Sequence, residues 1–359
     1  MGKSSLRTVT AAGKTRSVTL KTTSVTLKQV ADAVGVHFST VSRALNPATR
    51  DQVKPQIAGR IIETAQRLGY RTNTLASSLR TRRSKVIGVV VPDIASLLFP
   101  PILEGIESTL LKHGYMTIVA NTANDADRHR RILSGMIERR VDGLILASAT
   151  LHDPILDEWI SEQVPVILMN RSDDSGRAPS VINDDIRGMG LAVNHLVGLG
   201  HKRIAHIAGP QTLSTGATRA RGFHLAMSEQ VSGAKPLVIQ ADAFSREAGR
   251  TACVDLLERD PDVTAIVAAN DLLALGCYDA FHERNISCPR DISVTGYNDA
   301  PFMDLVAPPL TTVRIKQRDM GVEAARLLLM RIDGEAVPAD ILLRTELVPR
   351  RSTTTPRKA

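Results

Sequence analysis

The sequence predicts a small all-α head containing a helix-turn-helix, followed by an α/β body of two doubly wound parallel-sheet lobes. Near the N-terminus, apolar residues recur at helical spacing over three short segments separated by turn residues. Beyond Lys85, continuous Val/Ile/Leu runs alternate with amphipathic stretches of helical length, the pattern of βα units around buried parallel strands. The length of this second region favours two lobes over one.

The head is predicted from three helical segments. The first has one apolar face, formed by Leu27, Val30, Ala31 and Val34. Thr26 and Gln29 have the spacing of a capping box around its start, and Gly35 supplies the following turn. Residues 40–45 predict a second helix, and residues 55–68 predict a third that starts at a proline, which suits a first helical position.

The body is predicted as alternating strands and helices. Eight apolar runs are expected as buried parallel strands: 86–91, 116–120, 144–148, 164–169, 204–208, 237–240, 264–268 and 292–295. Amphipathic stretches between them are expected as helices, among them 102–113, 128–140, 188–199, 246–258 and 272–284. Two such lobes joined by several crossings would form a clamp like that of periplasmic binding proteins.

Composition excludes several protein classes. Of the 359 residues, 43% are apolar and 23% are charged, as in ordinary globular proteins. No apolar run approaches the roughly 18 residues that a membrane helix needs, and the N-terminus lacks the apolar stretch of a secretory signal. The three cysteines, Cys253, Cys277 and Cys288, are too few for a disulfide framework and indicate a reducing compartment. We therefore expect a cytoplasmic protein without membrane contact.

Charge is concentrated at the N-terminal end. The first 85 residues hold 16 of the 45 basic residues and only 3 of the 37 acidic ones, a net charge of +13, whereas the remainder carries −5. A basic head on a mildly acidic body indicates a nucleic-acid-binding module. Residues 1–24, which include Lys3, Arg7, Lys14, Arg16 and Lys21, are predicted as a flexible arm, either a solvated tail or a contact to phosphates.

The second head helix is the candidate for reading DNA, because the second helix of a helix-turn-helix enters the major groove. The side chains not needed inside the head are His37, Phe38, Ser39, Ser42 and Arg43. Arg43 is the best base reader among them, since its fork matches guanine O6 and N7. The alternative is a small protein-interaction bundle, against which the basic charge weighs.

Many collinear motifs strongly resemble the LacI/GalR (lac repressor) family of bacterial transcription regulators. The head carries Val25-Thr26-Leu27-Lys28-Gln29-Val30-Ala31 and Ser39-Thr40-Val41-Ser42-Arg43-Ala44-Leu45-Asn46. Asn73 to Arg80 is similar to the family's hinge helix, and Ile87-Gly88-Val89-Val90-Val91-Pro92-Asp93 to its first core strand. Ala269-Asn270-Asp271, Gly296-Tyr297-Asn298-Asp299 and Pro309-Leu310-Thr311-Thr312-Val313 follow in family order.

The resemblance implies the division of the chain and its DNA contacts. The domains are a basic arm (1–24), a helix-turn-helix DNA-binding domain (25–72), a hinge helix and linker (73–84), an effector-binding and dimerisation body (85–350) and a tail (351–359). DNA-binding residues are expected at Thr26, His37, Phe38, Ser39, Ser42, Arg43, Asn46, Asn73, Ser77, Leu79 and Arg80. Leu79 would wedge into the minor groove. His37 departs from the serine usual in the family and leaves the operator sequence open.

Ligands of open α/β sheets bind where the strands end. Asn170, Asn270 and Asn298 each follow a predicted strand. The resemblance implies effector contacts at Ser96, Phe99, Asn170, Arg219, Phe244, Asn270 and Asn298. Polar forks around an aromatic face suit a sugar or a nucleobase. Structural roles remain open: Arg219 pairing with an acid, Asn270 capping a helix and the two phenylalanines packing in the core. The amides Asn170 and Asn298, where the family often has Asp, favour an anionic effector beside Arg171 and Arg219.

Catalytic signatures are missing from the sequence. Gly13-Lys14-Thr15 resembles the end of a phosphate-binding loop, but Thr8 stands where that loop requires its first glycine. Gly188-Met189-Gly190 lacks the third glycine of a dinucleotide fingerprint, which argues against an NAD-type enzyme. Cysteines and histidines have no metal-ligand spacing. We expect no enzyme activity, no cofactor and no metal.

The sequence therefore predicts an effector-responsive transcription regulator, a repressor of a carbohydrate or sugar-acid utilisation operon. The residues after 350 contain no leucine heptads, so a homodimer on a pseudo-palindromic operator is expected rather than a larger assembly. The alternative is a soluble sugar-binding protein without a transcriptional role, against which the basic head argues.

Overall fold

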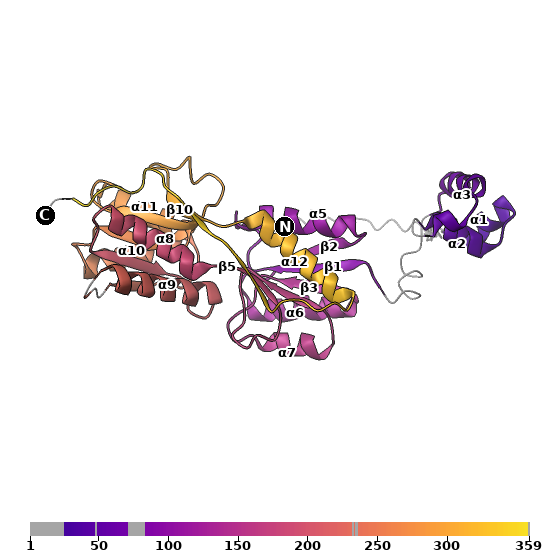
Figure 1. Cartoon of the computed structure of the whole chain (residues 1–359), viewed down its shortest axis with the longest axis horizontal. Coiled ribbons are helices and arrows are strands. Elements are labelled where there is room, and N and C mark those ends of the chain that lie inside the picture. The colour runs from indigo at the N-terminus through magenta and orange to yellow at the C-terminus, as the bar shows by residue number, and fades with distance from the viewer. Residues whose placement is uncertain (1–24, 47–48, 71–82, 232, 234–235, 358–359) are drawn as a thin grey trace, which may run out of the picture. The chain divides into compact units, whose positions relative to one another are not determined.

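The computed structural model describes residues 25–46, 49–70, 83–231, 233 and 236–357 (Figure 1). The chain divides into two compact units, Met1–Ser77 and Ser78–Ala359, called here the head and the body. The predicted arm and the hinge residues Asn73, Ser77, Leu79 and Arg80 lie outside the described residues. None of the described helices is long and apolar enough to cross a membrane.

The head consists of α1 (Leu27–Val34), α2 (Phe38–Leu45), a short 3-10 turn (Arg50–Gln52) and α3 (Pro55–Arg67). The capping box predicted at α1 is present: the Gln29 N–H donates to Thr26 Oγ1 at 3.3 Å, and the Thr26 N–H donates to Gln29 Oε1 at 2.7 Å. Gly35 then turns the chain in the left-handed region with φ 74°. Val30, Val41 and Ile61 are fully buried where the three helices meet.

Helix α2 begins at Phe38, two residues before its predicted start at residue 40. The reason is the side chain of His37, whose Nδ1 accepts from the Ser39 N–H at 3.4 Å and lies 2.8 Å from Ser39 Oγ. This contact satisfies one of the amides that the first helical turn leaves without a partner. His37 therefore takes the capping role that a serine or threonine usually performs.

The first lobe of the body has a six-stranded parallel sheet in the order β11-β5-β4-β3-β1-β2. Its strands are β1 (Val86–Val91), β2 (Met116–Asn121), β3 (Gly143–Leu146), β4 (Val166–Met169), β5 (Ser180–Asn183) and β11 (Asp340–Leu343). Helices α5 (Phe99–Lys112) and α12 (Gln317–Ile332) pack on one face, and α6 (Ala126–Glu138) and α7 (Pro154–Ser161) on the other (Figure 1).

The second lobe repeats this plan with the order β12-β10-β9-β8-β6-β7. Its strands are β6 (Ile204–Ala208), β7 (Val238–Gln240), β8 (Ala265–Ala268), β9 (Ser293–Asn298), β10 (Thr311–Arg314) and the antiparallel β12 (Glu346–Val348). Helices α8 (Asp185–Gly198) and α9 (Ser214–Gln230) cover one face, and α10 (Arg246–Arg259) and α11 (Asp271–Glu283) the other. The chain passes between the lobes after β5, after β10 and after β11.

Two predictions about the body were wrong. The apolar run 116–120 forms β2, but this is an edge strand with an exposed outer face, on which Met116 is 70% exposed. The segment after residue 350, expected as a tail outside the body, is bonded to the second sheet. Ser352 is fully buried, accepts from the Thr311 N–H at 2.7 Å and donates to the Val294 carbonyl at 2.6 Å. These polar contacts tie the chain end to the second sheet, which an apolar periodicity cannot reveal.

Candidate ligand cleft and nucleic-acid interface

The outer face of α2 carries the side chains predicted to read DNA. Val41 and Ala44 point into the head core, so the opposite face remains accessible. His37, Phe38, Arg43 and Asn46 are exposed or partly exposed, as are Ser39 and Ser42. Phe38 is 56% exposed, and its ring centroid lies 4.3 Å from that of His37. The start of α2 thus presents two adjacent rings beside hydroxyls and a guanidinium, groups that suit base edges and phosphates.

Thr26 is exposed, but its side chain is engaged in the capping box described above.

The loop after α2 is held by two hydrogen bonds to the last turn of that helix. Arg50 Nε donates to the Ala44 carbonyl at 3.1 Å, and Thr49 Oγ1 donates to the Arg43 carbonyl at 3.2 Å. These bonds fix the end of α2 through its backbone and do not engage the Arg43 side chain.

A cleft of about 580 Å³ lies between the two lobes of the body, at the carboxyl ends of their parallel strands. The structure brings all seven predicted effector residues to this cleft: Ser96, Phe99, Asn170, Arg219, Phe244, Asn270 and Asn298. They come from loops and helices that follow β1, β4, β6, β7, β8 and from the end of β9. A volume of this size accommodates a small molecule such as a monosaccharide derivative.

Arg219 is held by several partners in the wall of the cleft. It is 3% exposed, and its Nε donates to Asp185 at 3.1 Å. Nη1 donates to the Ala269 carbonyl at 2.8 Å, and Nη2 lies 3.5 Å from Asn298 Oδ1. The guanidinium carbon lies 3.9 Å over the Tyr297 ring. Burial raises the pKa of Asp185, and the positive charge of Arg219 opposes that rise. Asp185 is therefore the acidic partner of Arg219, a structural role that the sequence analysis left open.

Other predicted residues also have internal roles. Asn270 caps α11, because its Oδ1 accepts from the Leu273 N–H at 2.8 Å. Phe99 is almost fully buried at the start of α5. Phe244 is partly exposed and packs so close to Gly209 that a side chain there would collide with the ring. Each of these residues borders the cleft while helping to hold its wall.

Asn170 borders the cleft and has an unused hydrogen-bond acceptor. Its backbone lies in the left-handed region with φ 63°, and its N–H donates to the Val181 carbonyl at 2.9 Å. The buried Oδ1 has no hydrogen-bond partner among the described residues. A ligand hydroxyl or amine can supply the missing donor.

Three further polar residues of the cleft are not among the seven predicted effector contacts. His129 Nε2 lies 3.1 Å from Ser148 Oγ, and burial lowers the pKa of His129 while Asp153 opposes the change. Asp271 accepts from the Ala300 N–H at 2.8 Å and from Thr312 Oγ1 at 2.5 Å, and burial raises its pKa to about 7. Ser148 follows β3, so the strand-end rule could have found it, whereas no local pattern marks His129.

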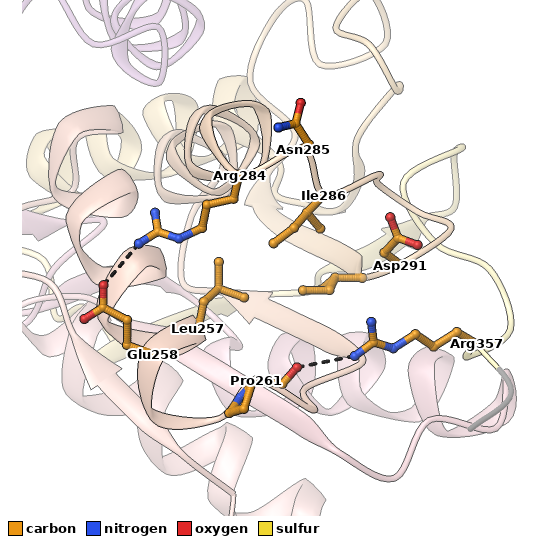
Figure 2. A pocket seen from close by; sticks show the side chains of 9 residues that line it. Leu257, Glu258, Pro261, Arg284, Asn285, Ile286, Asp291 and Arg357 are labelled. Carbon is orange, nitrogen blue, oxygen red and sulfur yellow. Dashed lines mark hydrogen bonds and ion pairs between the residues drawn. The ribbon is translucent and has the colours of Figure 1, made fainter.

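A second, smaller pocket of about 300 Å³ lies on the second lobe, lined by residues of α10, the segment after α11 and the chain end (Figure 2). Its arginines are already engaged. Arg284 contacts Glu258 at 3.1 Å, and Arg357 donates to the Pro261 carbonyl at 3.3 Å. Across the described residues, no cluster of three or more His, Cys, Asp or Glu side chains could hold a metal ion.

Comparison with known proteins identifies both units. Residues 26–73 match the family described as bacterial regulatory proteins, lacI family, and residues 193–353 match the periplasmic binding protein-like domain. The chain is 30% identical to catabolite control protein A of Priestia megaterium, over 89% of this chain and 96% of the relative. It is 31% identical to the HTH-type transcriptional repressor CytR of Escherichia coli strain K12, over 92% and 97% of the two chains.

Solved structures agree with this relationship. The lac repressor dimer bound to operator and the anti-inducer ONPF superposes with a TM-score of 0.81 and 29% identity, over 92% of this chain and 99% of that one. A LacI family transcriptional regulator from Enterococcus faecium with bound ribose gives a TM-score of 0.65 and 31% identity, over 76% and 100%. The two-lobed α/β body and the helix-turn-helix head predicted from the sequence are thereby confirmed.

Proposed function

Since this chain belongs to the lacI family of bacterial regulatory proteins and is a DNA-binding transcription regulator, we propose that it is a repressor controlled by a carbohydrate-derived effector. The observation that carries the proposal is the combination of α2, with its exposed reading face, and a 580 Å³ cleft at the strand ends of the body. One element suits DNA and the other suits a small polar molecule, and both belong to one polypeptide.

In the head, Arg43 reads a guanine edge, while Ser39, Ser42 and Asn46 contact bases or phosphates. Phe38 and His37 meet the groove at the start of α2, where a thymine methyl offers an apolar contact. Asn73, Ser77, Leu79 and Arg80 are assigned to the hinge by family resemblance alone, with Leu79 as the minor-groove wedge.

In the body, the ligand lies between the rings of Phe99 and Phe244 and the polar groups of the strand ends. Asn170 offers its unused carbonyl oxygen, and Arg219 and Asn298 bind hydroxyls from the opposite side. Ser96 and Asn270 complete the polar wall. No reaction is assigned to this cleft, and we infer that it binds its ligand without converting it.

The protein acts as a homodimer on a pseudo-palindromic operator, as the lac repressor dimer bound to operator suggests. Two copies of the head would then meet two half-sites related by the dimer axis. Because its target is chromosomal DNA, we place its action in the cytoplasm.

Effector and operator favour different arrangements of the lobes, and the coupling free energy in such systems is typically about 1–3 kcal/mol.

The test is selection of genomic DNA fragments by the purified full chain, followed by sequencing, with Arg43→Ala as the matched control. The wild type should enrich fragments that share one pseudo-palindromic motif, and the variant should lose that enrichment. Equal enrichment by both proteins would show that α2 does not read DNA and would refute the assignment.

A further inference from the structure

Arg171, directly after Asn170 at the end of β4, is buried in the cleft without an acidic partner among the described residues. The residue is only 7% exposed. In the part of the chain that the structure describes, its guanidinium has no ion pair within 4.0 Å, and its Nε is a buried donor without an acceptor. A buried, unpaired guanidinium is rare, because the charge is removed from water without compensation.

The neighbouring charge that acts on Arg171 is also positive. Burial, together with the smaller effect of the neighbouring positive charge of Arg219, lowers its pKa to about 10. Arg171 therefore remains protonated at neutral pH. Arg219 is neutralised by Asp185 at 3.1 Å, but no carboxylate of the described residues does the same for Arg171. The end of β4 is thus a site of uncompensated positive charge inside the cleft.

Five carboxylates border the cleft, and none of them forms an ion pair with Arg171: those of Asp93, Asp125, Asp153, Asp242 and Asp271. Asp125 accepts from the Arg128 N–H, Asp153 from the Thr150 N–H, and Asp271 from Ala300 and Thr312. Asp93 accepts from the Ala95 N–H within its own loop. These bonds hold four of the five carboxylates at helix starts and in loops, and Asp242 is exposed on the loop after β7. Because no described carboxylate pairs with Arg171, a bound anion can supply its counter-charge.

We propose that the effector of this cleft carries a carboxylate or phosphate group that binds to Arg171, which makes it a sugar acid or a sugar phosphate rather than a neutral sugar. A guanidinium binds either group through two parallel N–H···O bonds. The amide of Asn170, in place of a carboxylate, leaves that guanidinium available. This inference rests on the proposed effector-binding function and adds the chemical class of the effector.

The first experiment uses inorganic phosphate as the smallest probe. The unfolding midpoint of the full chain is measured against phosphate concentration at constant ionic strength, in wild type, Arg171→Met and Arg128→Met. Arg128 is an exposed arginine of α6 outside the cleft and controls for removal of one positive charge. Phosphate should raise the midpoint of wild type and of Arg128→Met, and the increase should disappear in Arg171→Met. Equal increases in all three proteins would overturn the proposal.

The second experiment separates the two anion classes with matched ligand pairs: glucuronate and glucose, galacturonate and galactose, and glucose 6-phosphate and glucose. The anionic member of at least one pair should bind wild type, and Arg171→Met should weaken it at least about tenfold, as expected when charged hydrogen bonds are removed. Asn170→Asp should weaken it too, because the added carboxylate competes for Arg171. Binding of a neutral member equal to that of its anionic partner would overturn the proposal.

A third measurement tests whether Arg171 has a structural role instead. Without ligand, Arg171→Met should raise the unfolding midpoint, since an unpaired buried charge is replaced by an apolar side chain. Arg219→Met should lower it, because Asp185 then loses its partner. A lower midpoint for Arg171→Met would mean that the native fold uses this charge, and it would overturn the proposal. None of these results depends on DNA, so loss of operator selection alone would refute only the proposed regulatory function.

Discussion

Arg219 on α9 donates to Asp185, the first residue of α8, at 3.1 Å. Asp185 follows directly on the crossing that leads from β5 of the first lobe into the second. The pair therefore joins the cleft to one of the three segments that connect the lobes. A ligand that changes the bonding of Arg219 therefore also acts on Asp185, which lies at a segment that joins the lobes. This pair is a physical route by which effector binding can be coupled to DNA binding.

Replacing Arg219 with Ala should lower the free energy of unfolding by about 3–5 kcal/mol, since it leaves the Asp185 carboxylate buried and unpaired. The double variant Arg219→Met with Asp185→Asn should recover most of that loss. Urea denaturation of the full chain measures both. If the single variant is as stable as wild type, the pair is not a structural element.

The same double variant should bind operator but no longer release it on addition of effector. The reason is that a ligand that loses its contacts with Arg219 can no longer distinguish the two lobe arrangements. Operator release is followed by fluorescence anisotropy during effector titration. Release at the same effector concentration as wild type would show that Arg219 has no role in ligand binding.

His206 should make the body less stable in mild acid. It is fully buried, its Nδ1 lies 2.7 Å from the Val267 carbonyl, and burial lowers its pKa from 6.5 to about 4. Between these values the unfolded chain binds a proton that the folded chain does not, so the free energy of unfolding falls as pH drops from about 6.5 to 4, by up to about 3 kcal/mol.

The control for this pH effect is His206→Asn, which keeps a donor for the carbonyl but does not titrate. The raised pKa of Asp271 acts in the opposite direction over the same range and is present in both proteins. The difference in unfolding free energy between wild type and variant should therefore shrink as the pH falls. A difference that stays constant between about pH 7 and 4.5 would contradict the assignment.

His37→Ala should destabilise the start of α2 by about 1 kcal/mol, the loss of stability typical for a removed N-cap. His37→Ser should retain most of the protection of the first-turn amides against hydrogen exchange. Hydrogen exchange of the amides of Ser39 and Thr40 in the full chain reports this directly. Equal exchange rates in wild type and both variants would show that the imidazole is not a working cap.

Leu79→Ala should weaken specific operator binding by a few kcal/mol of binding free energy, without changing ligand binding in the cleft. The basis is the resemblance of residues 73–80 to the family's hinge helix. Gel-shift titration on a selected operator gives the affinity, and ligand binding to the same protein controls for folding. Wild-type operator affinity would remove the wedge from the mechanism.

Removing residues 1–24 should leave specific binding in place. If the arm binds phosphates, the slope of log K against log salt should become shallower by about 0.9 for every phosphate that the arm neutralises. Titrations at several salt concentrations distinguish the two roles. An unchanged slope supports a solvated arm, and complete loss of binding would contradict both interpretations.

The position of the cleft could be predicted because strand ends are marked locally in the sequence. Asn170, Asn270 and Asn298 stand at the ends of apolar runs, and parallel strands bring such positions to one edge. Elements defined by distant partners were not predicted. Strand β11 pairs with β5 from a distant part of the chain, and Ser352 is buried by bonds to β9 and the start of β10. For the same reason the sequence does not reveal that Arg219 pairs with Asp185, or that Arg171 has no acidic partner among the described residues.

The three passages between the lobes also determine the order in which parts of the protein can fold during synthesis. The first sheet lacks β11 and the second lacks β12 until about 350 residues have been made, because both strands come from the last stretch of the chain. The head is a separate unit whose core residues all lie within the first 70. On the ribosome, the head can fold long before the body can close its sheets. Each new molecule can therefore complete its helix-turn-helix head before the cleft between the lobes is complete.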